Sequence, residues 1–280
     1  MTAKFLRIPA SLLAITMVIS MGAGLTRAAA QPNAAAQDKD KDKEKDKDKD
    51  KGKQKINKAE LAAYNAFVAA QKDDPATQVQ LGEDFLAKYP QSQYAPGVTA
   101  TLVTSYYAVG NIEKMFSTGD KALQLDPDNV DVLPVMSMAI SRRAKATTPD
   151  GVAQLQKAEG YAHHGIELIP NMAKPASLDD ALFEKAKNDK LALCHSALGL
   201  IDFNNKKYED SRTELKLAVQ LASTPDEVDY YLLGNADSAA SYYHEAVDAY
   251  KKCSDSGQLT AACKARAATA QHDAETKFGR

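Results

Sequence analysis

The sequence has little of what usually marks an enzyme or a disulfide scaffold. It has no tryptophan and only three cysteines in 280 residues, too few for a disulfide-dense fold. It has no glycine-rich phosphate loop and no G-x-S-x-G, C-x-x-C or H-E-x-x-H motif. The formal net charge of −2 argues against a nucleic-acid-binding protein, which normally carries a basic excess. We therefore expect no catalytic residues, no cofactor and no nucleic-acid partner.

The five histidines do not form the pattern of a metal site. His163 and His164 are adjacent, so on a helix their side chains would point about 100° apart. His244 lies four residues before Asp248, a spacing that usually indicates a solvated pair. We expect no metal ligands in the chain.

Only one stretch is long and apolar, and it stands at the N-terminus. Lys4 and Arg7 are followed by an uncharged apolar run over residues 8–25 and by small alanines at residues 28–30. This three-part pattern predicts a secretory signal peptide over residues 1–30. The run of about 18 residues is near the lower limit for a membrane span, so an uncleaved anchor is the alternative. We expect an exported protein, periplasmic or extracellular, with no stable membrane insertion once the signal is cleaved.

A run of alternating charges follows the apolar segment. Over residues 38–51 Asp or Glu alternates with Lys, and no apolar residue interrupts the run. Such a run can bury nothing, and residues four apart carry the same sign, which disfavours a helix. The acids from Asp46 onward are spaced as in an EF-hand loop, but Asn57 stands where that loop requires a bidentate glutamate. We expect residues 31–55 to form a disordered, Lys/Asp-rich tether.

The net charge is the sum over three segments with different charge compositions. The predicted signal holds three basic residues and no acidic ones, and residues 38–55 hold nine basic and seven acidic ones. The remaining 23 basic and 30 acidic residues give the predicted folded part a charge of −7. This acidity makes nucleic-acid binding a still poorer expectation.

From residue 56 onward the composition favours helix, and the sequence repeats itself. Two copies align with an offset of 35 residues. Their small residues would let two helices approach closely, and their large ones would fill the space between neighbouring hairpins. The aligned pairs are Leu198 and Leu233, Gly199 and Gly234, Tyr208 and Tyr243, Ser211 and Ala246, Leu215 and Tyr250, and Ala218 and Cys253.

These residues resemble the tetratricopeptide repeat (TPR) family. Its pattern places Leu-Gly and Tyr in a first helix, then Ala, an aromatic residue and Ala in a second helix, and finally Pro. Further copies resemble it at residues 96–128, 57–90 and 129–170, although Met115 replaces the small residue between the helices of the first of these. The matching residues are Leu102, Tyr106, Gly110, Ala122 and Pro127, then Ala66 and Pro90, then Met136, Ile140, Ala158, Gly165 and Pro170.

The resemblance implies an all-α fold, a right-handed α-solenoid of about five TPR-like helix hairpins over residues 56–280. Two segments depart from the repeat. Residues 143–152 enlarge the inter-helix loop of the third hairpin by about nine residues. Ser177, with Asp180 three residues later, predicts the N-cap of a short extra helix before the fourth hairpin. An alanine-rich run over residues 259–277 has the place of the family's C-terminal capping helix.

Two of the three cysteines fall where a disulfide is feasible. Cys253 lies late in the last predicted hairpin and Cys263 early in the predicted capping helix, with a turn between them. Export would provide oxidising conditions for a bond between them, and two separate packing thiols are the alternative. Cys194 has no evident partner, and we expect it to be a buried free thiol.

In the family that the chain resembles, partners usually bind the concave face lined by the first helices. A face that mixes aromatic and amide groups suits an extended peptide or a helix, although each of these residues could equally be core between repeats. We therefore expect a scaffold or adaptor that binds other, envelope-associated proteins. The expected contact residues are Phe67, Tyr107, Met138, Arg142, Leu200, Phe203, Asn204, Tyr231 and Asn235.

Two other function classes stay open. A periplasmic binding protein for a small molecule or a glycan would need a closed pocket with convergent polar groups. An enzyme with an unrecognised site would need a buried, strongly perturbed acid or histidine in a cleft. Residues 85–96 also resemble the first repeats of outer-membrane assembly and envelope-division adaptors, which hold partner proteins.

Overall fold

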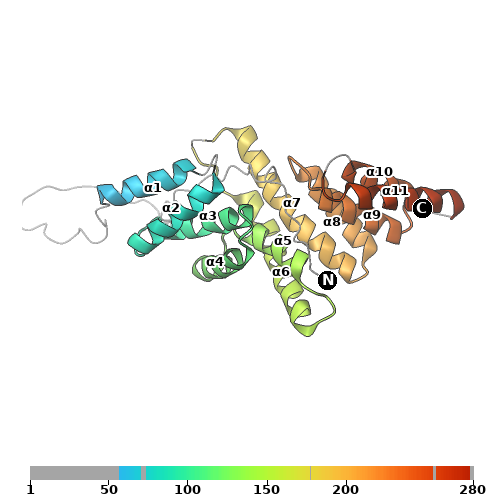
Figure 1. Cartoon of the computed structure of the whole chain (residues 1–280), viewed down its shortest axis with the longest axis horizontal. Helices are drawn as coiled ribbons and strands as arrows, with labels where there is room; N and C mark the ends of the chain where they lie inside the picture. The colour runs from blue at the N-terminus through green and yellow to red at the C-terminus, as the bar shows by residue number, and fades with distance from the viewer. Residues whose placement is uncertain (1–56, 71–73, 177, 255–256, 278–280) are drawn as a thin grey trace, which may run out of the picture.

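The computed structural model describes residues 57–70, 74–176, 178–254 and 257–277, and these residues contain helices and no strand (Figure 1). The predicted signal peptide and tether lie outside them. The described helices are α1 (Lys58–Ala70), α2 (Pro75–Lys88), α3 (Ala95–Ala108), α4 (Ile112–Leu125), α5 (Leu133–Arg143), α6 (Pro149–Leu168), the 3₁₀ helix η2 (Ile169–Asn171), α7 (Asp180–Asn204), α8 (Tyr208–Leu221), α9 (Glu227–Ala239), α10 (Tyr243–Cys253) and α11 (Thr260–Thr276).

The described helices pack as five consecutive pairs. α1 packs with α2, α3 with α4, α5 with α6, α7 with α8 and α9 with α10, and each pair also contacts the next. α11 packs against α10 and ends the stack, so α1 and α11 stand at opposite ends of the molecule (Figure 1). The predicted all-α solenoid of about five hairpins with a C-terminal capping helix is confirmed.

Side-chain caps set where several helices begin. Asp74, Asn111, Thr148, Asp179 and Asp226 each accept a hydrogen bond from a backbone amide in the first turn of the helix that follows. These amides have no partner within their own helix, so a cap of this kind typically stabilises a helix by about 1 kcal/mol. The sequence therefore fixes the start of α2, α4, α6, α7 and α9 locally.

The predicted extra helix is not a separate element. Residues 180–187 are helical, but they form the first two turns of α7, which continues without a break to Asn204. The cap is Asp179, whose carboxylate accepts a hydrogen bond from the Leu182 amide at 2.8 Å. The residue that was expected to cap the helix, Ser177, lies outside the described residues.

The connection within the third pair is shorter than the sequence predicted. α5 ends at Arg143 and α6 begins at Pro149, so only residues 144–148 connect the two helices. Most of the extra residues lengthen α6, which has 20 residues. Thr148 caps this longer helix, and the proline that follows it suits the first turn because its φ angle is fixed and it needs no amide partner there.

Glycines allow close contacts between the paired helices of the C-terminal half. A Cβ atom on Gly199 of α7 would lie 2.5 Å from Cγ of Leu215 of α8. A Cβ atom on Gly234 of α9 would lie 2.6 Å from the ring of Tyr250 of α10. The two glycines are 35 residues apart, and so are the two side chains that they face. The sequence repeat therefore corresponds to a repeat of the packing. The predicted close approach at both glycines is confirmed.

The turn between the two helices of a pair also repeats. Gly110, Lys206 and Ser241 have positive φ angles of 72°, 62° and 68°. In each turn the following amide donates a hydrogen bond to the carbonyl five residues before it, for example from Asn111 to Tyr106 at 2.8 Å. This Schellman ending favours glycine. The turn predicted at Gly110 is confirmed, whereas Lys206 and Ser241 adopt the same conformation with a side chain, at an energetic cost.

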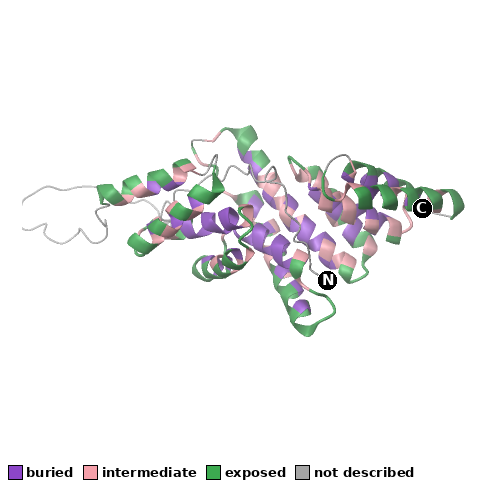
Figure 2. Cartoon of the chain, viewed as in Figure 1, coloured by how far each residue is buried: buried purple, intermediate pink, exposed green. Residues whose placement is uncertain are grey.

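Buried side chains concentrate along the middle of the stack, and the two ends are more exposed (Figure 2). One large cluster joins the first three pairs, and its two buried phenylalanines are each 1% exposed. Smaller clusters join α6 to α7, α8 to α9 and α10 to α11. Because one pair cannot bury both of its faces, each pair depends on its neighbours. The large cluster includes Phe67, Phe85, Leu102, Met115 and Met136.

Candidate partner-binding surfaces

Two of the nine residues expected on the concave face have almost no exposed surface. Phe67 is 1% exposed and belongs to the large core cluster, and Met138 is 3% exposed. The hydroxyl of Tyr107, another of the nine, lies 3.9 Å from Sδ of Met138. In this structure Phe67 and Met138 are therefore not available to a partner, which corrects their expected role.

Arg142 of α5, also among the nine, lies in a buried polar network with α7 and α9. Its guanidinium donates hydrogen bonds to Oδ2 of Asp226 at 2.7 Å and to Oδ1 of Asp229 at 3.0 Å. Ser196 of α7 donates to the same Asp229 oxygen at 2.6 Å. We call these four residues the Arg142 network. It joins the third pair to the fifth as well as to the fourth, so it departs from the nearest-neighbour contacts that are usual in a solenoid.

One guanidinium faces two buried carboxylates in the Arg142 network. Burial disfavours the charged arginine, but Asp229 and Asp226 outweigh this effect and raise the pKa of Arg142. Burial raises the pKa of Asp229, and Arg142 opposes the rise only in part. Burial also raises the pKa of the neighbouring Tyr107 hydroxyl. The network thus places an arginine and two carboxylates between helices, where their mutual pairing holds the helices together.

Seven of the nine residues keep exposed surface: Tyr107 and Arg142 are two of them, and the other five lie on α7 and α9. Asn204 is exposed and the others are partly exposed. Their neighbours hold them in place: the Phe203 and Tyr208 rings are 5.5 Å apart, and Tyr250 donates a hydrogen bond to Oδ1 of Asn235 at 2.8 Å. We call these residues the inner patch: Leu200, Phe203, Asn204, Tyr231 and Asn235.

Two open hollows lie between α4 and α6. The larger, of about 840 Å³, has Lys121 of α4 on one wall and Gly160 of α6 on the other. The smaller, of about 520 Å³, reaches the connection over residues 144–148. Both are lined by Asp120 and Lys157, whose ion pair of 2.8 Å crosses from α4 to α6. We call the two hollows together the α4–α6 trough.

The walls of the trough are fixed by contacts between them. The hydrogen bond to Asp120 raises the pKa of Lys157, and the Lys157 ammonium lies 5.6 Å from the centroid of the Tyr161 ring. A second pair, His164 and Asp128, crosses at 2.7 Å from Nε2 to Oδ1. Both ion pairs thus connect α6 to α4 or to the turn that follows α4.

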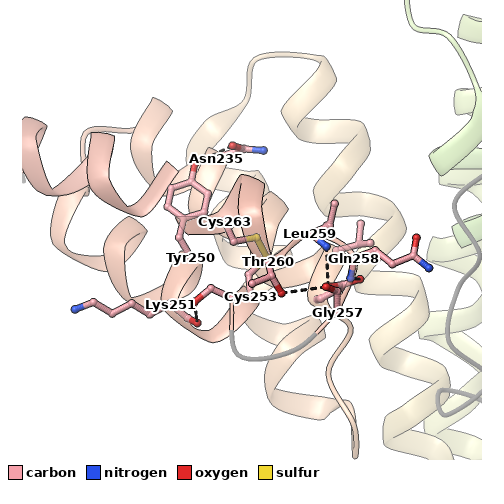
Figure 3. Close-up of a disulfide and its surroundings, with 12 residues drawn as sticks. Asn235, Tyr250, Lys251, Cys253, Gly257, Gln258, Leu259, Thr260 and Cys263 are labelled. Atoms are coloured by element: carbon pink, nitrogen blue, oxygen red, sulfur yellow. Dashed lines mark hydrogen bonds between the residues drawn. A yellow bond between two sulfur atoms is a disulfide. The ribbon is translucent and has the colours of Figure 1, made fainter. Parts of the chain in front are cut away.

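A disulfide joins Cys253 of α10 to Cys263 of α11, with their Cα atoms 5.9 Å apart (Figure 3). Glu227, at the start of α9, accepts hydrogen bonds from the amides of Gln258 and Leu259 at 3.1 and 3.2 Å. The terminal helix is thus held covalently from α10 and by hydrogen bonds from α9. The pairing feasible from the sequence is present, and it serves the docking of α11.

Two other titratable side chains of α7 are Cys194 and His195. Cys194 is a buried free thiol, as predicted, and burial raises its pKa to about 12. Nδ1 of His195 lies 2.6 Å from Oε2 of Glu214, a pair that joins α7 to α8. In the part of the chain that the structure describes, no group of three or more His, Cys, Asp or Glu side chains is placed to hold a metal ion. None of the described helices is both long and apolar enough to cross a membrane.

The sequence reasoning missed the trough and the two acids of the Arg142 network. Gly160 stands inside a helix, where glycine is unfavourable, and residues 144–148 depart from the repeat, so two signals for the trough were present. Asp226 and Asp229 are 84 and 87 residues away from Arg142 in the sequence. No local pattern connects residues so far apart.

No protein-family model and no curated protein matches the chain. Among solved structures, the chain is similar to a thermophilic TPR protein of Thermus thermophilus, with 17% sequence identity and a TM-score of 0.46. The similarity covers 76% of this chain and 96% of that one. The solenoid assignment itself follows from the helix pairs, the repeated glycine contacts and the repeated turns of this chain.

Proposed function

We propose that the chain is an exported scaffold that binds partner proteins through the inner patch. The observation that carries the proposal is the patch itself: α7 and α9, the first helices of successive pairs, keep aliphatic, aromatic and amide side chains partly exposed. Aromatic side chains contribute large contact areas at interfaces, and amides hydrogen-bond the backbone of a bound segment. A peptide or a helix of another protein fits such a surface.

The buried charges favour binding over catalysis. They are paired with one another between helices, as Asp229 is with Arg142, and as Asp237 is with Nε of Arg212 at 2.5 Å. The trough hollows are open, whereas a small-molecule or glycan site normally encloses most of its ligand. These features support a protein-binding role without chemistry of its own.

Export to the periplasm or the cell exterior is part of the proposal. Residues 1–30 have the three-part pattern of a signal peptide. The Cys253–Cys263 bond belongs to the type that forms and persists in oxidising compartments. The envelope-associated partner expected from the sequence would be met there.

The test is affinity capture from the organism that makes the chain, after chemical crosslinking in intact cells. The double variant Phe203→Ala/Tyr231→Ala removes the two rings of the inner patch. Aromatic residues at interface centres often contribute 2 kcal/mol or more, so recovery of the principal partner should fall about tenfold or more. Recovery is measured by quantitative mass spectrometry.

The matched control is Leu61→Ala/Leu182→Ala, which truncates two side chains outside the patch that are 40% and 45% exposed. This variant should recover the partner as the wild type does. Equal recovery by the inner-patch variant, with an unchanged melting temperature, would refute the patch as the binding surface. A full-length chain found only in the cytosol would refute export.

A further inference from the structure

The lining of the α4–α6 trough carries a net positive charge. Lys121 and Gly160 line the larger hollow, and Arg143 and Lys145 line the smaller one. Lys121, Arg143 and Lys145 are exposed and make no ion pair with a described carboxylate. The trough is thus a basic surface on a folded part whose net charge is −7.

The acidic groups of the trough are already engaged. Asp120 pairs with Lys157 across the trough, and Asp150 accepts a hydrogen bond from Gln154 at 2.8 Å. Asp150 also stands in the first turn of α6, where the helix dipole favours a negative charge. The lining has four cations, Lys121, Arg143, Lys145 and Lys157, and these outnumber the two carboxylates, so an occupant meets a net positive charge.

The trough has room for a second chain at one position in particular. A Cβ atom on Gly160 would meet no other atom within 4 Å, so the packing of the chain does not require glycine there. Glycine inside a helix is destabilising by about 1 kcal/mol relative to alanine. A glycine that the fold does not need, on the wall of an open hollow, lets an occupant approach the helix backbone closely.

The floor of the trough is apolar. Leu123, Leu133 and Met136 line it but are at most 7% exposed, so the apolar surface open to an occupant is mainly that of the partly exposed rings of Phe116 and Tyr161. An occupant therefore needs apolar side chains as well as negative charge. A nucleic acid offers phosphates without such side chains, so an acidic protein segment is the better fit.

We propose that the α4–α6 trough is a second docking surface, which binds an acidic, apolar-containing segment of a partner protein. The apolar side chains of the segment lie against Gly160 and the Phe116 and Tyr161 rings, and its carboxylates face Lys121, Arg143 and Lys145. The surface is formed by other helices than the inner patch, so it stands whether or not the inner patch binds a partner.

The experiment measures binding of two defined peptides to the full mature chain by fluorescence anisotropy. Both are labelled 14-residue peptides with the same leucine and tyrosine positions; one carries glutamate and the other lysine at every remaining position. The glutamate peptide should bind about tenfold more tightly than the lysine peptide, and the difference should shrink as salt is raised. Lys121→Glu/Lys145→Glu should abolish or reverse the preference.

Matched variants separate the trough from the rest of the surface. Gly160→Tyr fills the larger hollow and should weaken binding of the glutamate peptide at least about fivefold. Gly97→Tyr is the control, because a Cβ atom on Gly97 also meets nothing within 4 Å. Lys185→Glu/Lys264→Glu repeats the charge change on α7 and α11, outside the trough, and should leave the preference for the glutamate peptide in place.

Three outcomes would overturn the proposal. The first is no preference between the two peptides, and the second is equal weakening by Gly160→Tyr and Gly97→Tyr. The third is tighter binding of a 14-nucleotide DNA or of anionic phospholipid vesicles than of the glutamate peptide, which would assign the trough to another class of polyanion. Circular dichroism and melting temperature confirm that each variant is folded before its binding is scored.

Discussion

Replacing Arg142 by methionine tests whether the Arg142 network holds the third, fourth and fifth pairs together. Methionine keeps an unbranched, flexible side chain but leaves Asp226 and Asp229, whose side chains are each 9% exposed, without a cation. Removing one partner of a buried ion pair costs about 3–5 kcal/mol. A folded chain typically has a free energy of unfolding of about 5–15 kcal/mol, so this single change should remove a large share of it.

The assay is urea unfolding of the mature chain at pH 7, followed by circular dichroism. Arg143→Met is the matched control, since Arg143 is exposed and its guanidinium carbon lies 5.9 Å from the centroid of the Phe116 ring. An exposed cation–aromatic contact contributes about 0.5–1 kcal/mol, so the control should lower the free energy of unfolding by no more than that.

The pH dependence gives a second check of the same prediction. Burial raises the pKa of Asp229 in the folded state, so the folded chain binds a proton more readily than the unfolded chain does. Proton binding to Asp229 therefore stabilises the folded chain at low pH. This contribution to the free energy of unfolding is lost as pH rises through the folded-state pKa. Because Arg142 opposes the rise, Arg142→Met should raise the pKa of Asp229 further. The loss of free energy of unfolding caused by Arg142→Met should accordingly be smaller at pH 5 than at pH 7.

A cost below about 1 kcal/mol, or one no larger than that of the Arg143→Met control, would refute the reasoning. It would mean that the two carboxylates reach water once the arginine is gone. Asp229→Asn in the Arg142→Met background should restore part of the lost stability, because it removes one unpaired charge. If the loss of free energy of unfolding caused by Arg142→Met grew as pH fell, it would contradict a raised pKa for Asp229.

Three further predictions follow from single features. Lys206→Gly and Ser241→Gly should each raise the free energy of unfolding by about 1 kcal/mol in urea titrations, because glycine relieves the positive φ angle; lower stability would contradict the turn assignment. Cys253→Ala/Cys263→Ala should lower it by roughly 2–3 kcal/mol, and a similar loss should appear when the wild type is reduced. Mass spectrometry of the secreted or periplasmic chain should find its N-terminus at Gln31, whereas a retained N-terminal segment would support the uncleaved anchor.

The repeating parts of the fold could be predicted from the sequence because their determinants are local or periodic. Gly199 and Gly234 stand 35 residues apart, and each faces a large side chain of the paired helix. Gly110 marks a turn that requires a positive φ angle. The prediction was wrong at the start of α7: a separate short helix capped by Ser177 was expected, whereas Asp179 caps a helix that continues to Asn204.

The candidate surfaces were only partly predictable, because exposure depends on how neighbouring pairs approach one another. Phe67 and Met138 stand at positions that the resemblance to TPR repeats assigns to the concave face, yet both are buried. Arg142 stands at another such position, and its role is set by two acids more than 80 residues away. A single sequence contains the spacing along one helix but not the distance between helices of different pairs.

Site-specific photocrosslinking in the organism that makes the chain tests the scaffold function most directly. A photoreactive amino acid is placed at Phe203 in the inner patch, at Gly160 in the trough, and at Leu61 and Gly97 as controls. If the chain is a scaffold with two docking surfaces, the first two positions each yield a discrete protein adduct that the controls lack. Identical labelling at all four positions, or no protein adduct at Phe203 and Gly160 in an exported, folded chain, would contradict the scaffold function.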